Sequence, residues 1–291
     1  MDDPSGDRPL SDPPSSAGLQ IPAGVEAAIV LLRHGESVHI TEGRFQGQAD
    51  SPLSPLGERQ AALTAERLAR PGERPALPIS PIPPLEIVHS PLLRAARTAE
   101  LVAAAMDGRV GSPPPLRPEP DLKELAQGRW EGKRREEIEA EDGELLAAWR
   151  RDPLRAHAPG GESVMDAAGR ARAAVGRAVA RLASTPEAQA SSSWSGRGAV
   201  AGYPGPAGAD APWSLLVGHD GVFKLVVLAL LGLPLERFWA FSFALCGLTV
   251  VELRDGRGVL RAHNLVEHLA VLAEEPRAEA EAASREATGA L

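Results

Sequence analysis

Residues 27–36 read AAIVLLRHGE, in which an apolar run ends at Arg33 and His34. A short, uninterrupted apolar run is typical of a strand that is buried on both faces, as the strands of a parallel sheet are. In open α/β sheets, ligands bind outside the carboxyl ends of the strands. The stretch therefore predicts a buried strand over residues 27–32 that delivers Arg33 and His34 to a ligand site. A histidine held there beside an arginine is suited to accept a phosphoryl group.

The chain contains two further apolar runs of the same kind, Leu85–His89 and Trp213–Gly218. Helical periodicity marks four other stretches: Leu56–Leu68, Leu92–Met106, Ser163–Leu182 and Val222–Leu233. The alternation of strand and helix predicts an α/β fold, in which helices cover both faces of a mostly parallel sheet. Residues 246–253 and 259–263, on either side of Asp255-Gly256, indicate a terminal hairpin.

We expect one domain over residues 26–273, with less ordered segments before, within and after it. Residues 1–25 are rich in Asp, Pro and Ser, and they are predicted to form a disordered extension. Residues 184–212 contain mainly Ser, Gly, Ala and Pro, and they are predicted to form a flexible insertion. Residues 274–291 are an Ala/Glu-rich tail, and residues 71–84 are a proline-rich connection.

Composition limits the class of protein. The 291 residues carry a formal net charge of −8, which argues against general binding to nucleic acid or to a membrane surface. The longest apolar stretch, Val222–Leu233, is too short to cross a bilayer, and residues 1–22 lack the apolar core of a secretion signal. A single cysteine, Cys246, excludes an internal disulfide and fits a reducing compartment. We therefore expect a cytoplasmic protein without a nucleic-acid or membrane partner.

The other two strand ends carry groups that suit a phosphoryl ligand. Arg94 falls on the first turn of the helix after the second strand, and His219 directly follows the third strand. A helix then begins, and the amino-terminal end of a helix favours anions. Together with Arg33 and His34, these residues would surround one phosphoryl group with matched donors. A histidine nucleophile must be neutral at its attacking nitrogen. Arg97 is a nearby alternative to Arg94.

An alkoxide leaving group also needs a proton, and a carboxyl group in the pocket is the usual donor. Glu124 is the candidate, because Gly128 and Gly132 in its segment indicate a loop that can approach the site. Three other carboxylates remain alternatives: Glu131, Glu136 and Glu162. No cluster of Cys and His in the sequence has the spacing of metal ligands.

The whole pattern resembles the histidine phosphatase superfamily, in its phosphoglycerate mutase-like branch. The resemblance covers residues 26–269 in order, and these segments carry it: 32–37, 43–50, 53–61, 90–99, 122–132, 159–163 and 217–219. It implies a three-layer α/β/α sandwich and an enzyme that uses no metal or organic cofactor. It also implies that His34 is the nucleophile that becomes phosphohistidine, and that Glu124 is the general acid and then the base.

The same resemblance implies which residues contact the substrate: Arg33, Ser37, Gln46, Gly47, Arg94 and His219. The two arginines and the histidine would hold the phosphoryl group during catalysis. The serine would lie beside the pocket, and the other two residues fall where members of the superfamily contact substrate.

The chain departs from the superfamily pattern at two places. Many relatives carry an asparagine where this chain has His39-Ile40, so an asparagine contact to phosphate is missing or supplied elsewhere. Relatives often have glycine after the second histidine, where this chain has Asp220. Asp220 is either the amino-terminal cap of the following helix or a residue that tunes His219, and we favour the cap because aspartate is a good N-cap. Arg44 is either a phosphate contact or a loop cation. Two tryptophans are interpreted as packing residues: Trp130 and Trp149.

The leading hypothesis is a phosphomonoesterase that hydrolyses a small phosphorylated metabolite. Residues 128–132, which follow Glu124, are similar to phosphatase members, and Leu125 stands where mutases usually have an arginine. A phosphoglycerate-type mutase is the alternative, because residues 149–151 (WRR) resemble a mutase segment whose arginines grip a carboxylate. A non-catalytic phospho-ligand-binding protein of the same fold, and a homodimer, are also left open.

Overall fold

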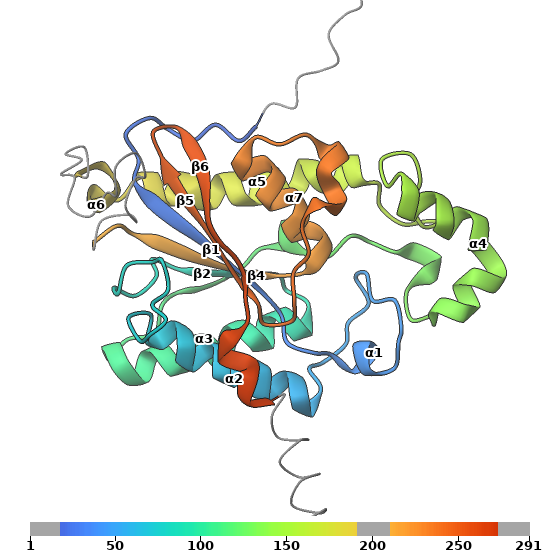
Figure 1. Ribbon diagram of the computed structural model, residues 1–291, viewed down its shortest axis with the longest axis horizontal. Coiled ribbons are helices and arrows are strands. Elements are labelled where there is room, and N and C mark those ends of the chain that lie inside the picture. The colour runs from blue at the N-terminus through green and yellow to red at the C-terminus, as the bar shows by residue number, and fades with distance from the viewer. Residues whose placement is uncertain (1–17, 191–209, 273–291) are drawn as a thin grey trace, which may run out of the picture.

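The computed structural model describes residues 18–190 and 210–272, and its central element is a six-stranded sheet (Figure 1). The strands lie in the order β3-β2-β4-β1-β5-β6. Their bounds are β1 Ala27–Arg33, β2 Ile87–His89, β3 Leu116–Pro118, β4 Trp213–Gly218, β5 Leu248–Arg254 and β6 Arg257–Leu265. The first four strands pair in parallel, and the β5–β6 hairpin pairs antiparallel beside β1. The predicted mostly parallel sheet and terminal hairpin are confirmed.

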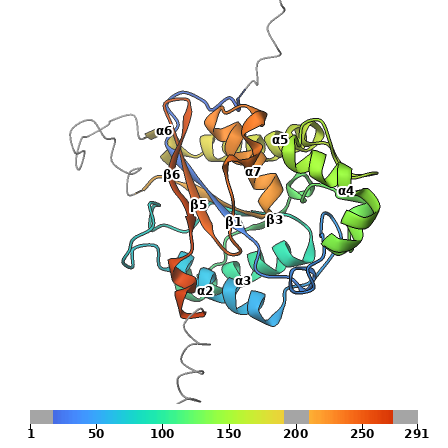
Figure 2. The same cartoon turned by 45° about the vertical axis from the view of Figure 1, so that its right-hand side comes forward.

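Helices cover both faces of this sheet. Their bounds are α1 Val38–Thr41, α2 Pro55–Ala69, α3 Leu93–Val110, α4 Arg135–Arg151, α5 Val164–Ala183, α6 Pro186–Ala190 and α7 Asp220–Leu231. Short 3₁₀ turns occur at Pro120–Leu122, Gly128–Trp130, Leu235–Ala240 and Glu267–Leu269. Figures 1 and 2 place α2 and α3 on one face and α5 and α7 on the other, which is the expected three-layer arrangement. The sequence did not predict α1, α4, α6 or β3.

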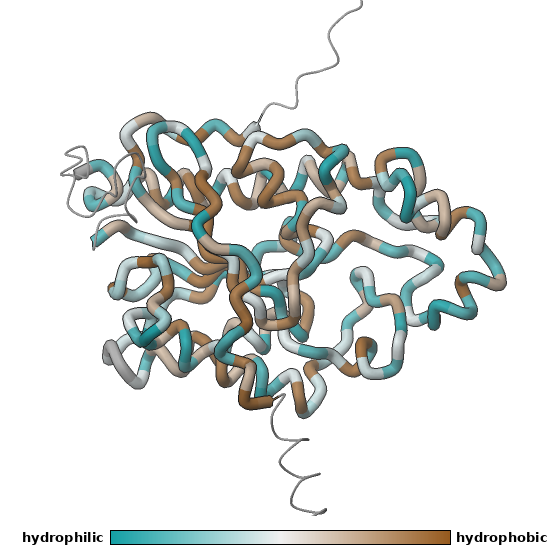
Figure 3. Tube along the Cα trace, in the orientation of Figure 1, coloured by the Kyte–Doolittle hydropathy of each residue, from teal (hydrophilic) through white to brown (hydrophobic). Residues whose placement is uncertain are grey.

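Strand β1 shows why its apolar run is uninterrupted. Successive side chains of a strand point to opposite faces of the sheet. Ile29 and Leu31 accordingly pack with α5 and α7, whereas Val30 and Leu32 pack with α2 and α3. All four side chains are at most 1 % exposed. Hydrophobic residues concentrate along the sheet and α7 in Figure 3, while the outer helices are mixed. The two-sided burial fixes β1, and with it the residues that follow.

The end of the predicted disordered extension is ordered. Residues 18–25 pack on the domain, and Ile21 and Val25 are buried in the cluster that lies under α5 and α7. These two apolar side chains lie at the boundary of a segment whose average composition is polar. The ordered part of the chain therefore begins at residue 18 or earlier, whereas the polar composition of residues 1–25 placed the start of the domain at residue 26.

The predicted flexible insertion 184–212 also begins with ordered structure. Helix α6 occupies its first part, and Ala188 is fully buried in the core. The rest of the predicted extension, insertion and tail lies outside the described part of the chain: residues 1–17, 191–209 and 273–291. Among the described residues, no helix is long and apolar enough to cross a membrane.

Two glycines let α2 approach the loop that follows His34. A Cβ atom on Gly35 would lie 2.5 Å from the carbonyl oxygen of Gly57, and a Cβ on Gly57 would overlap the carbonyl of Glu36. Ser54, the N-cap of α2, accepts the Gly57 N–H at 3.0 Å and donates its hydroxyl to Glu36 Oε1 at 2.6 Å. This backbone contact holds the loop after His34 against α2.

We therefore expect Gly57→Ala to destabilise the fold by about 1–3 kcal/mol, the usual cost of overpacking a tight contact. Gly169→Ala is the matched control, because Gly169 lies on an exposed face of α5 with open space around it. That change should be neutral or stabilising by up to about 1 kcal/mol. Urea unfolding of both variants measures the difference. A Gly57→Ala protein as stable as wild type would contradict the described contact.

Candidate active site

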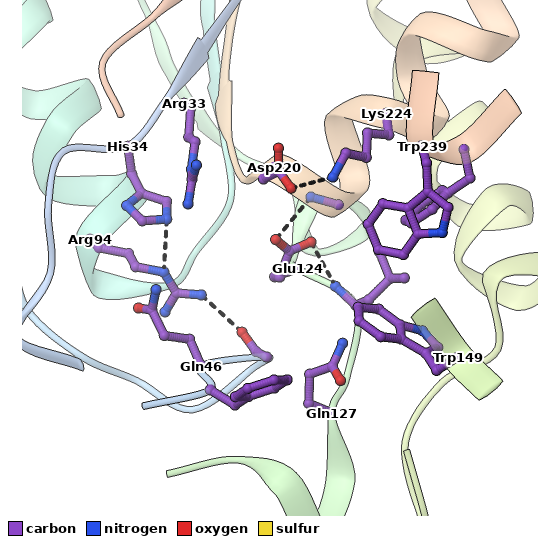
Figure 4. Close-up of a pocket in the computed structure, with 15 residues that line it drawn as sticks. Arg33, His34, Gln46, Arg94, Glu124, Gln127, Trp149, Asp220, Lys224 and Trp239 are labelled. Atoms are coloured by element: carbon purple, nitrogen blue, oxygen red, sulfur yellow. Dashed lines mark hydrogen bonds and ion pairs between the residues drawn. The ribbon is translucent and has the colours of Figure 1, made fainter. Parts of the chain in front are cut away.

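A cavity of about 330 Å³ lies at the carboxyl ends of the central strands (Figure 4). This volume is within the range of about 300–1,000 Å³ that is usual for small-molecule sites. Its lining residues are Arg33, His34, Phe45, Gln46, Gly47, Arg94, Glu124, Leu125, Gln127, Trp149, Asp220, Gly221, Lys224, Phe238 and Trp239. Four of the five residues predicted to be catalytic are in this set. The fifth, His219, lies behind the wall, with its ring centroid 5.0 Å from that of His34.

His34 follows β1 and is only 2 % exposed. Its Nδ1 lies 2.6 Å from the carbonyl oxygen of Gly35. Because a carbonyl only accepts hydrogen bonds, this contact assigns the proton to Nδ1 and leaves a lone pair on Nε2. Arg94 donates its Nε–H to that Nε2 at 3.3 Å. Burial, followed by the charges of Arg94 and Arg33, holds the pKa of His34 well below its usual value. The imidazole is therefore neutral, with Nε2 available to attack a phosphorus atom.

Arg94 comes from the first turn of α3 and is fully buried. Its guanidinium donates to the carbonyl oxygens of Gly47 and Ala49, each at 2.9 Å. Burial lowers its pKa to about 10, so the side chain stays charged at neutral pH. The alternative, Arg97, is exposed and pairs with Glu58, with its Nε 3.0 Å from the carboxylate. Arg94 is thus the α3 arginine that faces the cavity.

His219 and Arg33 complete the cationic end of the cavity. His219 is the N-cap residue of α7, is fully buried, and has its Nε2 2.8 Å from the hydroxyl of Ser90. Burial and the charge of Arg94 hold the pKa of His219 well below its usual value. Its Nδ1 has no hydrogen-bond partner among the described residues. Arg33 lines the cavity and donates to the carbonyl oxygen of Phe243 at 2.5 Å. The predicted two arginines and two histidines therefore converge.

Glu124 reaches the cavity from the loop before residues 128–130. Its Oε2 accepts the N–H of Gly221 at 3.0 Å, and its Oε1 accepts the N–H groups of Val222 at 3.0 Å and Leu125 at 2.9 Å. The carboxylate is thereby fixed at the amino-terminal end of α7, where a helix favours negative charge. The three alternative carboxylates do not line the cavity: Glu131, Glu136 and Glu162. Glu131 accepts backbone N–H groups, and Glu136 is exposed. Glu162 forms an ion pair with Arg170.

The loop after α1 supplies part of the wall. Two predicted substrate contacts in this loop, Gln46 and Gly47, line the cavity. The third, Ser37, lies just before α1 and does not line it. Ser37 is buried, accepts an N–H as the N-cap of α1, and donates its hydroxyl to Gln46 Oε1 at 2.7 Å. Its position thus suits holding Gln46 in place. Arg44 is a loop cation, because it pairs with Glu42 and donates to a loop carbonyl.

One interpretation of the sequence was wrong. Asp220 is not the helix cap, because His219 occupies that position and Asp220 is the first residue inside α7. Its Oδ1 accepts the N–H of Phe243 at 3.0 Å, and its Oδ2 pairs with Lys224 Nζ at 2.5 Å. Trp149 packs edge to face against Trp130, as expected of a packing residue, and it also lines the cavity. Trp130, by contrast, is fully buried, as expected of a packing residue.

Sequence reasoning missed the aromatic end of the cavity. Its members come from segments far apart in the chain: Gln127, Trp149, Lys224, Phe238 and Trp239. A signal existed for one of them, because a single lysine interrupts the apolar run of α7 four residues after an aspartate. That spacing places the two charges on one side of a helix. The other members carry no local signal.

Comparison with known proteins identifies the family. The family model "Histidine phosphatase superfamily (branch 1)" matches residues 29–186 and 206–266. The chain is 34 % identical to the glucosyl-3-phosphoglycerate phosphatase of Mycolicibacterium vanbaalenii, over 72 % of this chain and 76 % of the relative. It is 38 % identical to the 2,3-bisphosphoglycerate-dependent phosphoglycerate mutase of Thermobifida fusca, over 43 % of this chain and 46 % of the relative.

A solved structure agrees with this. The mycobacterial glucosyl-3-phosphoglycerate phosphatase in complex with VO3 matches with a TM-score of 0.62 at 30 % identity, covering 82 % of this chain and 99 % of that one. The chain belongs to the histidine phosphatase superfamily, which confirms the resemblance found in the sequence. It is an enzyme of the histidine phosphatase class.

The lowered pKa values of His34 and His219 predict how stability varies with pH. An unfolded histidine titrates near pH ~6.5. Below that pH the unfolded chain binds protons that the folded imidazoles do not yet bind, so the free energy of unfolding should fall as the pH drops. In ¹⁵N NMR spectra at pH 6, both rings should be neutral, with the proton of His34 on Nδ1. Titration of both rings near their ordinary value would contradict the described burial.

Proposed function

We propose that the protein is a phosphomonoesterase that hydrolyses a small phosphorylated metabolite through a phosphohistidine on His34. One observation carries the proposal: a neutral, buried imidazole lines the cavity, and its unprotonated Nε2 is in contact with the buried Arg94 guanidinium. Arg33 lines the same cavity, and the ring centroid of His219 lies 5.0 Å from that of His34. The transition state of phosphoryl transfer needs charge stabilisation at its oxygens, and this arrangement supplies it before the substrate arrives.

In the first step, the lone pair of His34 Nε2 forms a bond to phosphorus. The bond between phosphorus and the bridging oxygen breaks, and its electron pair goes to that oxygen. Glu124, in its protonated form, transfers a proton to the departing oxygen, so the product is a neutral alcohol. The imidazole keeps its Nδ1 proton, and the carbonyl of Gly35 stabilises the positive charge that the phosphorylated ring acquires.

In the second step, Glu124 takes a proton from a water molecule that attacks phosphorus on the side the alcohol has left. The bond between phosphorus and Nε2 breaks, and its electron pair returns to the imidazole. Inorganic phosphate then leaves, and His34 and Glu124 regain their starting protonation. The N–H groups that fix Glu124 at the start of α7 keep it in the same place for both transfers.

Hydrolysis is better supported than the mutase reaction. Arg150 and Arg151, which resemble a carboxylate grip of mutases, do not line the cavity. The chain is 34 % identical to a named phosphatase over 72 % of its length, and 28 % identical to a probable phosphoglycerate mutase over 78 % of its length, so identity favours the phosphatase at similar coverage. We place the reaction in the cytoplasm, because the buried Cys246 is a free thiol, as a reducing compartment would keep it.

Replacement of the proposed acid tests the roles of His34 and Glu124 together. Glu124→Gln should hydrolyse alkyl phosphates about 10²–10⁴-fold more slowly, the usual contribution of general acid–base catalysis. With p-nitrophenyl phosphate, whose leaving group needs no proton, the first step should survive and the second should stall. A burst of nitrophenol and an acid-labile phosphohistidine should therefore appear, and His34→Ala should abolish both.

Glu136→Gln is the control, because Glu136 is exposed on α4 and lies outside the cavity. It should retain wild-type rates with both substrates. A labelled phosphohistidine that persists in His34→Ala, or a Glu124→Gln enzyme that is as fast as wild type with alkyl phosphates, would refute the proposed roles.

A further inference from the structure

The cavity has two chemically different ends, with Glu124 between them (Figure 4). His34, Arg33 and Arg94 form the phosphoryl end, and Trp149, Trp239 and Lys224 lie on the opposite side of Glu124. If Glu124 protonates the bridging oxygen, as in the proposed function on which this inference rests, then the leaving group extends toward the second end. This second end is the aromatic end described above, and its chemistry therefore selects the substrate.

The aromatic end presents flat apolar surface. The rings of Trp149 and Trp239 meet edge to face, with centroids 5.1 Å apart and planes at 86°. They form a corner rather than a parallel slot. Trp239 is 44 % exposed, although an indole is among the side chains that gain most from burial. An exposed aromatic ring at the mouth of a cavity offers a surface on which a ligand can pack.

The polar groups of the aromatic end carry donors and acceptors without a net charge. Lys224 pairs with Asp220 at 2.5 Å, and its ammonium lies 4.8 Å from the centroid of the Trp239 ring. The pair is neutral as a unit, yet the ammonium has three N–H donors, of which the carboxylate uses one. Gln127 lines the same end, and its Oε1 is buried without a hydrogen-bond partner among the described residues. Protein atoms cover that oxygen, so a ligand hydroxyl at this end meets instead the remaining N–H donors of Lys224.

These features discriminate between leaving groups. A leaving group with a carboxylate would find no unpaired cation here, because Lys224 is already neutralised by Asp220. A flat apolar group would fill the corner but leave the remaining N–H donors of Lys224 without an acceptor. A sugar satisfies both needs, because its ring has apolar C–H faces and a rim of hydroxyl groups. We propose that the enzyme takes the phosphate monoester of a pentose- or hexose-sized sugar, with the sugar ring in the corner of Trp149 and Trp239.

Steady-state kinetics with two sets of monoesters test this proposal. One set holds pentose and hexose monophosphates, and the other holds acyclic monoesters: glycerol 3-phosphate, 3-phosphoglycerate and O-phosphoserine. The best sugar phosphate should exceed every acyclic monoester in kcat/KM by about tenfold or more. Trp239→Ala should lower kcat/KM for that sugar phosphate by about tenfold, as loss of a stacking ring does, and change the acyclic set by about twofold or less.

Two further variants keep the test decisive. Met165→Ala is the matched control, because Met165 is 59 % exposed on α5 and does not line the cavity, so both sets should be unaffected. Trp149→Ala removes the other ring of the corner, and it should lower only the sugar set. It serves in place of Trp239→Ala if that variant does not fold.

The possible failures are distinguishable. Acyclic monoesters hydrolysed as fast as sugar phosphates, or variants that slow both sets equally, would overturn the sugar specificity and leave the phosphatase intact. Release of phosphate from no monoester at all, p-nitrophenyl phosphate included, would overturn the proposed function and the sugar specificity with it.

Discussion

The contact between the buried guanidinium of Arg94 and the imidazole of His34 is the interaction on which the site depends. A buried charge is costly unless hydrogen-bond acceptors surround it. Arg94 meets this condition through the carbonyl oxygens of Gly47 and Ala49, so the loop after α1 must close over α3 before the guanidinium can be buried. The same charge helps to keep His34 neutral. One arginine thus joins three segments, orders part of the cavity wall and prepares the nucleophile.

The fold divides the chemistry between its strands and its helices. Strand β1, packed on both faces, fixes the position of His34, and the close contact of Gly35 with α2 fixes the loop behind it. Helix α7 performs the corresponding task on the other side, because its first backbone N–H groups hold Glu124 and its N-cap residue is His219. The proposed nucleophile is therefore held by the sheet and the proposed proton carrier by helix α7, and the leaving group would lie between them.

The phosphoryl end of the cavity was predictable from the sequence, and the aromatic end was not. Arg33 ends strand β1, His34 directly follows it, and His219 directly follows β4, so local pattern and the rule for strand ends are enough to bring them together. Trp149 and Trp239 lie in a helix and a 3₁₀ turn whose meeting depends on tertiary packing that no short pattern encodes.

Asp220 shows a second limit of sequence reasoning. Aspartate is a good helix cap, but the extended backbone of His219 already occupies the cap position. Asp220 therefore lies inside the first turn. Its carboxylate forms an ion pair with Lys224, four residues on, and accepts the N–H of Phe243. The cap propensity of aspartate favoured Asp220, but in the folded chain the cap position belongs to His219.

The structure of the protein with bound vanadate is the measurement that tests the account most directly, because vanadate mimics a phosphoryl group during transfer. We expect vanadium to be bonded to Nε2 of His34, with Glu124 facing the position opposite His34. The vanadate oxygens should be contacted by Arg33, Arg94 and His219. Vanadate bonded to another side chain, or held at a distance from Nε2 by groups other than these, would contradict the account.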